Sequence, residues 1–411
     1  MRIAVKSKDF KRAFTAVKRF TARHYGHDLF ASVKITLNPN RVFLMGCDGD
    51  NDISYGIHGK TEGTDEHSVA VVGAKRLGEM VKGFHTEEVI DIEIVEGKIS
   101  FRVGSIDLAV ESRSTENFPE IIPPVGEEIR GTATMEADWW RDLFRKINFV
   151  IPNEETRHYI NGMFLHREKK GKKTLLRAVS TDGHRLSIAE TEMPKGLDRL
   201  SLYNPITPKK SVAEETEAQK RRREKRDKEI SYTIVPRKAA LECARLLGKK
   251  EVEVVFEFSE TKCSFFFYDE TETIAITAKL INGTYPNYKR VTEQVKRDNP
   301  HEIKIGGVAL YDGFEPLRRV EGKYVSLELT KTTMVIAVET DLNDYEKVKR
   351  TIEVESPVSG RIGLNKGYLA DYIKSAESQT HRVAYKDEGS PLAFTSGKGY
   401  THIVMPYRLP S

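Results

Sequence analysis

The feature that most constrains the fold of this chain is an internal repeat. Three segments each read as a strand end, a Lys at the opening of a helix, and apolar residues at helical spacing: 72–81, 235–244 and 363–372. Each is followed by alternating strand patterns and then by an aromatic-Pro or Met-Pro pair, ending at Pro119, Pro286 and Pro406. The separation between the Lys and the Pro is similar in all three, and such self-similarity predicts repeated structural units.

The first half of each repeat carries a second shared pattern. An apolar strand runs into an Asp in every repeat, at Asp48, Asp182 and Asp341. A helix is expected before each of these strands, over 7–20, 136–149 and 308–319. Ser7 and Asp138 are the expected N-caps of the first two helices. Each repeat therefore reads as strand, helix and three strands, twice over, so the chain is built from doubled βαβββ units.

A chain of 411 residues is too long for one ordinary core, which also predicts several domains. The segments 121–126 and 294–300 are rich in Pro, Gly or polar residues, as expected of boundaries that few contacts cross. The predicted domains are 1–127, 128–293 and 294–411.

The second repeat is longer than the others because of a charged insertion, 208–230. The insertion has no apolar face, so one interpretation is a solvated helix or loop. The other interpretation is a direct contact with DNA or with a protein partner.

Composition excludes several classes of protein. No apolar run approaches the length of a membrane span, and the N-terminus lacks the apolar core of a signal peptide. The three cysteines, Cys47, Cys243 and Cys263, are widely spaced and form no metal or redox motif. Reduced thiols and a cytoplasmic location are therefore expected. The net charge of +5 is mild, so any affinity for nucleic acid must come from where the charges lie.

The expected helices share an excess of basic residues. These are Lys8, Lys11, Arg12, Lys18, Arg19, Lys75, Arg76, Lys82, Arg141, Arg145, Lys146, Arg237, Lys238, Arg245, Arg318, Arg319, Lys366 and Lys374. One such helix would be an ordinary solvated face, but the same bias at matching positions of a repeat favours a basic surface lined by helices. That surface would bind backbone phosphate without reading bases. No phosphate-cradling loop and no paired metal carboxylates are present, so we expect no cofactor and no metal.

Ser180, Asp182 and His184 lie within five residues and raise the hypothesis of a hydrolase. Neighbouring residues of a strand point to opposite faces, so these three cannot converge as nucleophile, base and orienting group. We therefore expect a turn and part of a binding surface here.

Four motifs together resemble the bacterial DNA polymerase III beta subunits, the sliding clamps. They are Tyr159-Ile160-Asn161-Gly162-Met163, Asp182-Gly183-His184-Arg185-Leu186, the segment 281–291 and the ending Val404-Met405-Pro406-Tyr407-Arg408-Leu409. The resemblance covers the chain outside the insertion and is strongest in the second and third repeats. It implies an α+β fold of three tandem DNA-clamp domains, each a doubled βαβββ unit, that form half of a closed ring. Two chains would complete the ring head to tail.

The resemblance further implies a DNA sliding clamp without catalytic residues. The homodimeric ring would encircle duplex DNA, slide without sequence specificity and tether the replicative polymerase for processivity. Clamp loader, DNA polymerase and repair proteins would dock through short hydrophobic motifs. The alternative is an open, basic repeat protein that coats DNA non-specifically as a monomer, with a steep dependence on salt.

Two sets of site residues follow from the resemblance. The first is a partner-peptide groove between the second and third domains, formed by Thr181, Gly183, His184, Arg185, Leu186, Pro286, Arg290, Val291, Val404, Met405, Pro406, Tyr407, Arg408 and Leu409. The second is a DNA-facing set, formed by Lys11, Arg12, Arg23, His24, Lys75, Arg76, Arg141, Arg145, Tyr159, Arg237, Lys238 and Lys366. Tyr407 stands where the family often has Met, and Pro410-Ser411 extends beyond the usual end, so we expect a reshaped groove.

Overall fold

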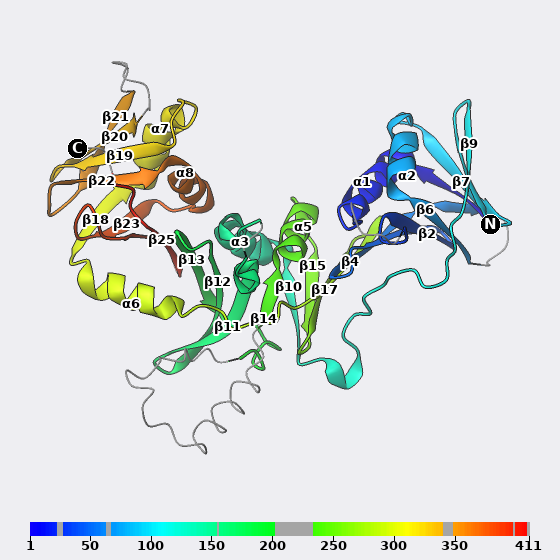
Figure 1. The fold of residues 1–411 in the computed structure, drawn as a ribbon, viewed down its shortest axis with the longest axis horizontal. Helices are drawn as coiled ribbons and strands as arrows, with labels where there is room; N and C mark the ends of the chain where they lie inside the picture. The colour runs from blue at the N-terminus through cyan, green and yellow to red at the C-terminus, as the bar shows by residue number, and fades with distance from the viewer. Residues whose placement is uncertain are drawn as a thin grey trace. The chain divides into compact units, whose positions relative to one another are not determined.

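The computed structural model describes residues 1–22, 28–62, 67–153, 156–201, 233–339, 348–397 and 399–408. The chain divides into two compact units, both drawn in Figure 1. Unit 1 comprises Met1–Arg141, Lys195–Arg199 and Lys238–Leu280, and unit 2 comprises Asp142–Pro194, Leu200–Arg237 and Ile281–Ser411. The predicted insertion 208–230, together with Arg23, His24, Asp341 and Leu409, lies outside the described residues.

The order of elements repeats three times along the chain. The first repeat holds β1 (Arg2–Lys6), α1 (Ser7–Lys18), β2 (Ser32–Asn38), β3 (Arg41–Cys47), β4 (Asn51–His58), β6 (Ser68–Gly73), α2 (Ala74–Lys82), β7 (Val89–Val95), β8 (Lys98–Val103) and β9 (Ile106–Glu111). The second holds β10 (Gly131–Glu136), α3 (Ala137–Ile147), β11 (Gly162–Lys170), β12 (Lys173–Thr181), β13 (Arg185–Glu192), β14 (Thr233–Pro236), α5 (Arg237–Leu247), β15 (Glu253–Phe258), β16 (Lys262–Tyr268) and β17 (Glu272–Lys279). The third holds β18 (His301–Gly306), α7 (Gly307–Arg318), β19 (Tyr324–Leu329), β20 (Thr333–Glu339), β21 (Lys349–Glu355), β22 (Gly360–Asn365), α8 (Lys366–Ser375), β23 (Thr380–Tyr385), β24 (Leu392–Ser396) and β25 (Tyr400–Val404).

This order confirms the doubled βαβββ unit and the α+β fold class. The remaining elements are the short strand β5 (Lys60–Glu62), the helix α6 (Tyr288–Asp298) and the 3-10 turns η1 (Gly126–Glu128), η2 (Asn148–Val150) and η3 (His158–Ile160). The division into domains at 127 and 293 stays a prediction.

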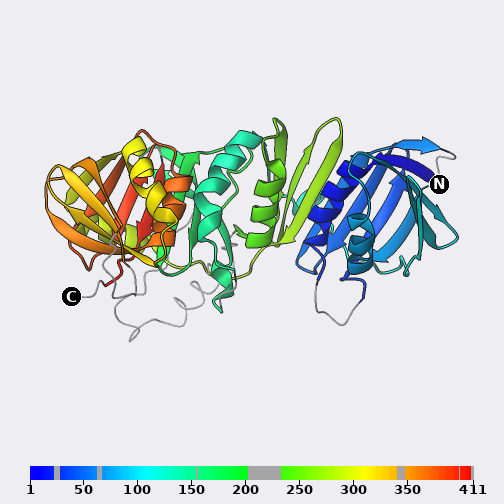
Figure 2. The same ribbon diagram turned by 90° about the horizontal axis from the view of Figure 1, so that it is seen from above.

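Unit 1 contains two sheets and the helices that cover them. Its five-stranded sheet has the order β5-β1-β7-β8-β9, and its eight-stranded sheet has the order β10-β15-β16-β17-β4-β3-β2-β6. The pairing of β4 with β17 joins strands of the first and second repeats in one sheet. Helix α1 buries Phe10, Phe14 and Val17 against this unit because they recur at helical spacing. Figure 2 shows α1 next to α2 against the strands.

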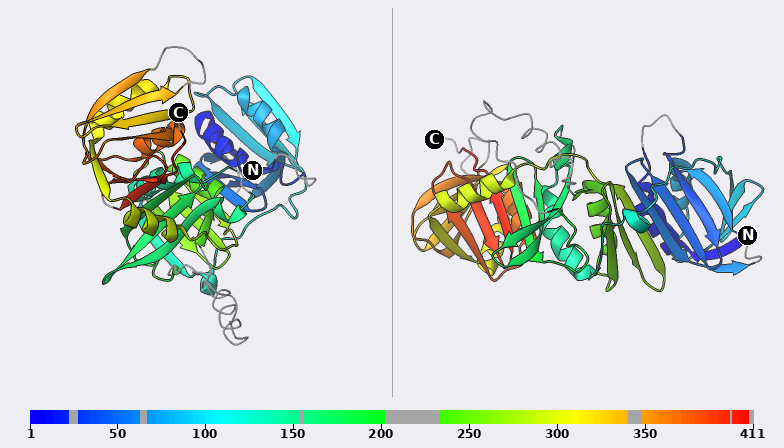
Figure 3. Two further views of the ribbon diagram at one scale, coloured as in Figure 1. Left: turned by 60° about the vertical axis from the view of Figure 1, so that its left-hand side comes forward. Right: turned by 90° about the horizontal axis from the view of Figure 1, so that it is seen from below.

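Unit 2 contains one twelve-stranded sheet with the order β14-β11-β12-β13-β25-β24-β23-β18-β21-β20-β19-β22. Antiparallel pairing of β13 with β25, from Arg185↔Val404 to Ala189↔Tyr400, joins strands of the second and third repeats. Figures 1 and 3 show green β13 beside red β25. The ends of distant segments therefore meet at this junction.

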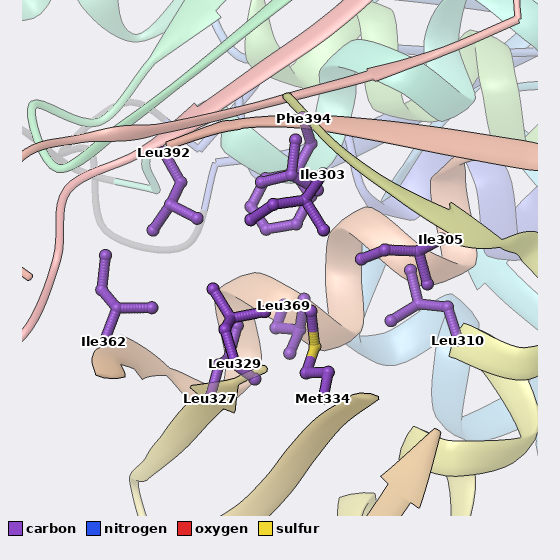
Figure 4. Close-up of a pocket in the computed structure, with 11 residues that line it drawn as sticks. Ile303, Ile305, Leu310, Leu327, Leu329, Met334, Ile362, Leu369, Leu392 and Phe394 are labelled. Carbon is purple, nitrogen blue, oxygen red and sulfur yellow. The ribbon is translucent and has the colours of Figure 1, made fainter. Parts of the chain in front are cut away.

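The core of the third repeat contains a cavity with an apolar lining. Side chains from both strands and helices surround a small internal cavity of about 10 Å³. Figure 4 shows Ile303 and Phe394 on one side of it, facing Leu329, Met334 and Leu369 on the other. The cavity has room for about one water-sized sphere and no polar lining, so it is a packing void rather than a ligand site.

The structure corrects three predictions about local structure. Ser7 is the first residue of α1 and Lys6 is its N-cap, so the predicted Ser7 cap is wrong. Asp138 lies inside the first turn of α3 and pairs with Arg141, so it is not the cap either. The polar segment 294–300 is largely helical, because α6 runs to Asp298 and buries Val295 against the core.

Cys47, Cys243 and Cys263 are buried and free. Among the described residues, the helices are too short or too polar to cross a lipid bilayer.

Candidate partner-binding groove and basic helices

A pocket of about 180 Å³ lies in unit 2 where four separate stretches of chain meet. These are the stretch 157–160 that includes η3, the turn between β12 and β13, the start of α6, and the end of β25. The lining residues are Arg157, Ile160, Thr181, Gly183, His184, Arg185, Leu186, Pro286, Asn287, Tyr288, Val291, Ile403 and Met405. Ile, Leu, Val, Pro and Met supply most of the surface, which suits an apolar ligand with a few polar anchors.

The turn at 181–186 is built by its own hydrogen bonds. The Asp182 Oδ1 accepts from the backbone N–H of His184 and of Arg185, each at 2.9 Å. The Thr181 hydroxyl donates to the Arg185 carbonyl at 2.8 Å. Gly183 has φ of +90°, a conformation that favours glycine. These hydrogen bonds stabilise the turn, and all of them lie within residues 181–185.

The hydrogen bonds of Ser180 and Asp182 contradict the hydrolase hypothesis. The buried Ser180 hydroxyl donates to the Ile147 carbonyl at 2.8 Å, and Asp182 is occupied by backbone N–H groups of the turn. Asp48 plays the matching role in the first repeat, where its Oδ1 accepts from the backbone N–H of Asn51 at 2.7 Å. Asp48 and Asp182, each at the end of an apolar strand, are therefore turn-forming residues.

Arg185 fixes the wall of the groove to the third repeat. Its side chain is only 9% exposed and forms ion pairs with Asp182 at 2.9 Å and with Asp371 of α8 at 2.7 Å. It also donates to the Phe149 carbonyl at 2.8 Å and lies over the Tyr368 ring at 4.2 Å from the centroid. A planar guanidinium with five donors is suited to this many partners.

The α6 side of the groove rests on a buried polar pair. The Tyr288 hydroxyl lies 2.7 Å from Nε2 of His166, which is fully buried. Burial lowers the pKa of His166 to about 3, so this imidazole is neutral and the pair carries no charge beneath the pocket. The Asn287 side chain caps α6 by accepting from the Arg290 backbone N–H at 3.3 Å.

The C-terminal segment contributes Met405 to the pocket lining, whereas Tyr407 contacts other residues. The Met405 backbone N–H donates to the His184 carbonyl at 2.9 Å, and Met405 is 45% exposed and lines the pocket. Tyr407 instead stacks on Tyr324, and its backbone N–H donates to the Gly363 carbonyl at 2.8 Å. Tyr407 therefore lies outside the set of pocket-lining residues.

The structure brings together part of the predicted groove. The predicted residues that line the pocket are Thr181, Gly183, His184, Arg185, Leu186, Pro286, Val291 and Met405. The other described residues of the predicted groove do not line the pocket. They are Arg290, Val404, Pro406, Tyr407 and Arg408. Val404 is buried in the β13–β25 pairing.

Sequence reasoning missed Arg157, Ile160, Asn287, Tyr288 and Ile403. Four of these lie within or next to the motifs that carried the resemblance, and could have been taken with them. Arg157 lies immediately before η3, and only the folded chain places it at the pocket.

The predicted DNA-facing residues divide into two groups. Lys75 and Arg76 at the start of α2 are exposed. Several others hold protein groups: Lys11 donates to Phe84 O, Arg141 to Lys250 O, Arg237 to Ile151 O and Lys366 to Val320 O, while Arg12 pairs with Glu272, Arg145 with Glu377 and Lys238 with Asp48. Tyr159 is partly buried beside His158. The basic residues of the helices are thus largely held in position by carbonyl and carboxylate oxygens.

Comparison with known proteins gives a consistent picture. Residues 134–231 match the family model described as DNA polymerase III beta subunit, central domain. The beta sliding clamp of Pseudomonas putida is 24% identical over 390 residues, covering 93% of this chain and 92% of the relative. That of Caulobacter vibrioides is 28% identical over 275 residues, covering 65% and 63%.

Solved structures agree in fold. The DnaN sliding clamp of Bartonella birtlesii, determined bound to griselimycin, is 22% identical with a TM-score of 0.79 over 100% of both chains. The DNA polymerase sliding clamp of Caulobacter crescentus is 21% identical with a TM-score of 0.76, again over 100% of both chains.

Proposed function

This chain belongs to the bacterial DNA polymerase III beta subunits, the beta sliding clamps, and we propose that two copies close head to tail into a ring around duplex DNA. Members of this family are processivity factors and not enzymes. A heterologous contact that closes after two copies gives a finite assembly rather than a filament. Pairing of strand edges across such a contact would also remove edges that are otherwise open to aggregation.

The observation that carries the proposal is the groove in unit 2. It joins an apolar floor, which includes Ile160, Leu186 and Ile403, to polar groups at the rim such as His184. Short peptides with hydrophobic anchors bind grooves of this kind, with the anchors in the pocket and backbone groups at the rim. We propose that clamp loader, polymerase and repair proteins dock here through such peptides.

The basic helices support the DNA part of the proposal. A ring holds DNA by enclosure, so its lining needs only weak contacts with phosphate, and weak contacts permit sliding. Cations that already pair with carbonyl and carboxylate oxygens of the protein suit this role, because fewer of their N–H donors are available to each phosphate. The proposed place of action is the cytoplasm, where bacterial duplex DNA lies.

The alternative of an open, basic repeat protein that coats DNA as a monomer is not supported, because the relatives that match nearly the whole chain are sliding clamps. A test of the ring uses the full chain together with its clamp loader. The expected results are a dimeric mass in solution and retention on nicked circular DNA with rapid loss from linear DNA. Equal retention on both forms at moderate salt would overturn enclosure.

A further inference from the structure

The hairpin that joins β11 to β12 carries a dense cluster of positive charge. Its tip reads Lys169-Lys170-Gly171-Lys172-Lys173, and all of these residues are exposed. Lys170 pairs with Lys173 across the ladder, so Gly171 and Lys172 form a two-residue turn, and Gly171 has a φ of +61°. Gly at the first central position is typical of a type II′ hairpin turn. A tight, local turn therefore brings together these four lysines, the hairpin lysines.

The pairing of Lys170 with Lys173 places two like charges directly opposite each other. Like charges in this position destabilise a hairpin, and a local rule broken in this way is typical of functional sites. Lys170 is 68% exposed and pairs with Glu190 at 2.9 Å. In the part of the chain that the structure describes, the other three hairpin lysines make no ion pair. Most of the charge at the tip is therefore open to solvent.

The acidic residues along the hairpin do not neutralise its tip. Glu168 is 14% exposed and pairs with Lys289 of α6 at 2.7 Å. Glu190 is 12% exposed and pairs with Arg177 at 2.8 Å as well as with Lys170. Glu192 is exposed and lies opposite Leu175, farther from the turn than the hairpin lysines. Two of the three acids are therefore already balanced by cations other than the hairpin lysines.

Helices α6 and α8 cover opposite faces of the twelve-stranded sheet (Figure 1). Ile188 of β13 belongs to the core cluster that includes Tyr288 of α6. The hydroxyl of its neighbour Ser187 lies 3.5 Å from the Tyr400 hydroxyl, which lies 2.7 Å from the hydroxyl of Ser375 of α8. Neighbouring residues of a strand point to opposite faces, so the basic helix α8 lies on the face away from α6.

Two of the hairpin lysines lie on the α6 face. Glu168 pairs with Lys289 of α6, and Lys170 lies two residues farther along β11, on the same face. Lys173 is directly opposite Lys170 and shares that face. Duplex DNA held against basic helices such as α8 would lie on the other side of the sheet. A protein docked in the groove would instead lie beside α6, because Tyr288 of α6 lines the groove.

We propose that the tip of this hairpin is a docking surface for an acidic segment of a protein partner. Carboxylates complement the hairpin lysines in charge and would relieve the repulsion between Lys170 and Lys173. The inference deepens the proposed function, on which it rests for the partner: one protein places hydrophobic anchors in the groove and an acidic segment on the tip. Strand β12 runs from Lys173 at the tip to Thr181 at the groove, about 26 Å at the rise of a strand. About eight extended residues of the partner span that distance.

The test titrates the full chain with a labelled octaglutamate peptide, by fluorescence anisotropy at low ionic strength, with an octaglutamine peptide as the reference. The double change Lys172→Glu and Lys173→Glu reverses two charges of the tip and should weaken octaglutamate binding at least about tenfold. The double change Lys60→Glu and Lys331→Glu makes the same change in net charge at exposed positions elsewhere. This control should stay within about twofold of the parent, because salt screens distant charges.

The single change Lys173→Glu separates docking from folding. It turns the like-charged pair with Lys170 into an oppositely charged pair, while Glu192 lies only on a diagonal. The free energy of unfolding should therefore stay at the parent value or rise. Octaglutamate affinity should still fall several-fold, because a docking cation has become an anion. A fall in affinity accompanied by an equal fall in stability would contradict a direct role of Lys173.

The remaining outcomes separate the tip from the groove and from nucleic acid. Octaglutamate that binds no better than octaglutamine, or equal loss in the tip and control variants, would overturn the docking surface. A short duplex DNA that binds through Lys172 and Lys173 more tightly than octaglutamate would assign the tip to nucleic acid and reject the proposal. Octaglutamate binding by a chain that binds no hydrophobic partner peptide would keep the tip and reject the groove. Normal groove binding and retention on circular DNA without octaglutamate binding would reject the tip alone.

Discussion

The ring of Tyr407 lies flat on the ring of Tyr324, with centroids 3.4 Å apart and planes 10° from parallel. This stack anchors the chain two residues beyond Met405, which lines the groove. Replacing Tyr324 by Ala should therefore lower the free energy of unfolding by about 1 kcal/mol. It should also weaken partner-peptide binding several-fold, because Met405 loses its downstream anchor. Denaturant unfolding and fluorescence anisotropy with a labelled peptide measure the two effects.

Tyr324→Phe is the matched control for this change, since it retains the stacked ring and should behave as the parent chain. Peptide affinity that is equal in the Ala variant and the parent would show that the stack and the groove are independent.

Removal of Met405 to Ser411 should abolish partner-peptide binding and leave the dimer intact. The deletion takes away one wall of the groove and the hydrogen bond from Met405 to the His184 carbonyl. Sedimentation reports the dimer, and peptide titration reports the groove. Normal peptide binding by the truncated chain would refute the assignment of the groove.

Val291→Glu should reduce peptide affinity at least about tenfold, because a charge in an apolar pocket must lose water when a hydrophobic anchor enters. Stability should change little, since Val291 is 36% exposed. Gln294→Glu makes the same charge change at an exposed position of α6 outside the pocket and should bind normally. If both variants lose affinity equally, long-range charge and not the pocket is responsible.

Arg185 and Asp371 should show a strong energetic coupling. Arg185→Met leaves Asp182 without its partner and should cost about 3 kcal/mol of stability. Asp371→Asn should cost less, because Asp371 is 41% exposed and Arg185 keeps its other partners. A double-mutant cycle from denaturant unfolding should give a coupling energy of about 1–2 kcal/mol. Additive effects would mean that the ion pair contributes nothing to stability.

We expect an unusual dependence of stability on pH, because the buried carboxyl of Asp52 has a raised pKa. Burial raises the pKa of this carboxyl to about 8, and the nearby Glu120 adds to the shift while the Ile121 backbone hydrogen bond opposes it. Between its ordinary pKa of 3.8 and 8, the folded chain keeps a proton that the unfolded chain releases. The contribution of Asp52 to the free energy of unfolding is therefore complete below the pKa that Asp52 has in the unfolded chain. It is lost as pH rises toward 8.

Asp52→Asn removes this titration. Between about pH 5 and about pH 8, the parent should lose more unfolding free energy than the variant, by up to about 1.4 kcal/mol per pH unit. Urea unfolding at both values measures the difference. A parallel pH profile for the two proteins would show that Asp52 is ionised in the folded chain.

Local patterns in the sequence were sufficient for the repeat and for most elements. Apolar periodicity located α1, α3 and α7 to within a few residues, and the strand that ends before Asp182 was placed correctly. Such patterns succeed because a helix or strand face is decided by residues only a few positions apart. Helix α6 was missed, because its segment is polar and its helicity depends on Val295 and Tyr288 packing against distant strands.

The candidate site likewise has one part that the sequence predicted and another that only the tertiary structure determined. The motif around Asp182 was enough to identify a turn and one wall of the groove, since the hydrogen bonds that shape it are local. Only the tertiary structure decided that Arg157 completes the pocket, that Tyr407 stacks on Tyr324, and that Glu242 pairs with both Arg19 of α1 and Arg245 of α5. These contacts join residues tens to hundreds of positions apart, and their geometry follows from how the sheets pair and not from any local pattern.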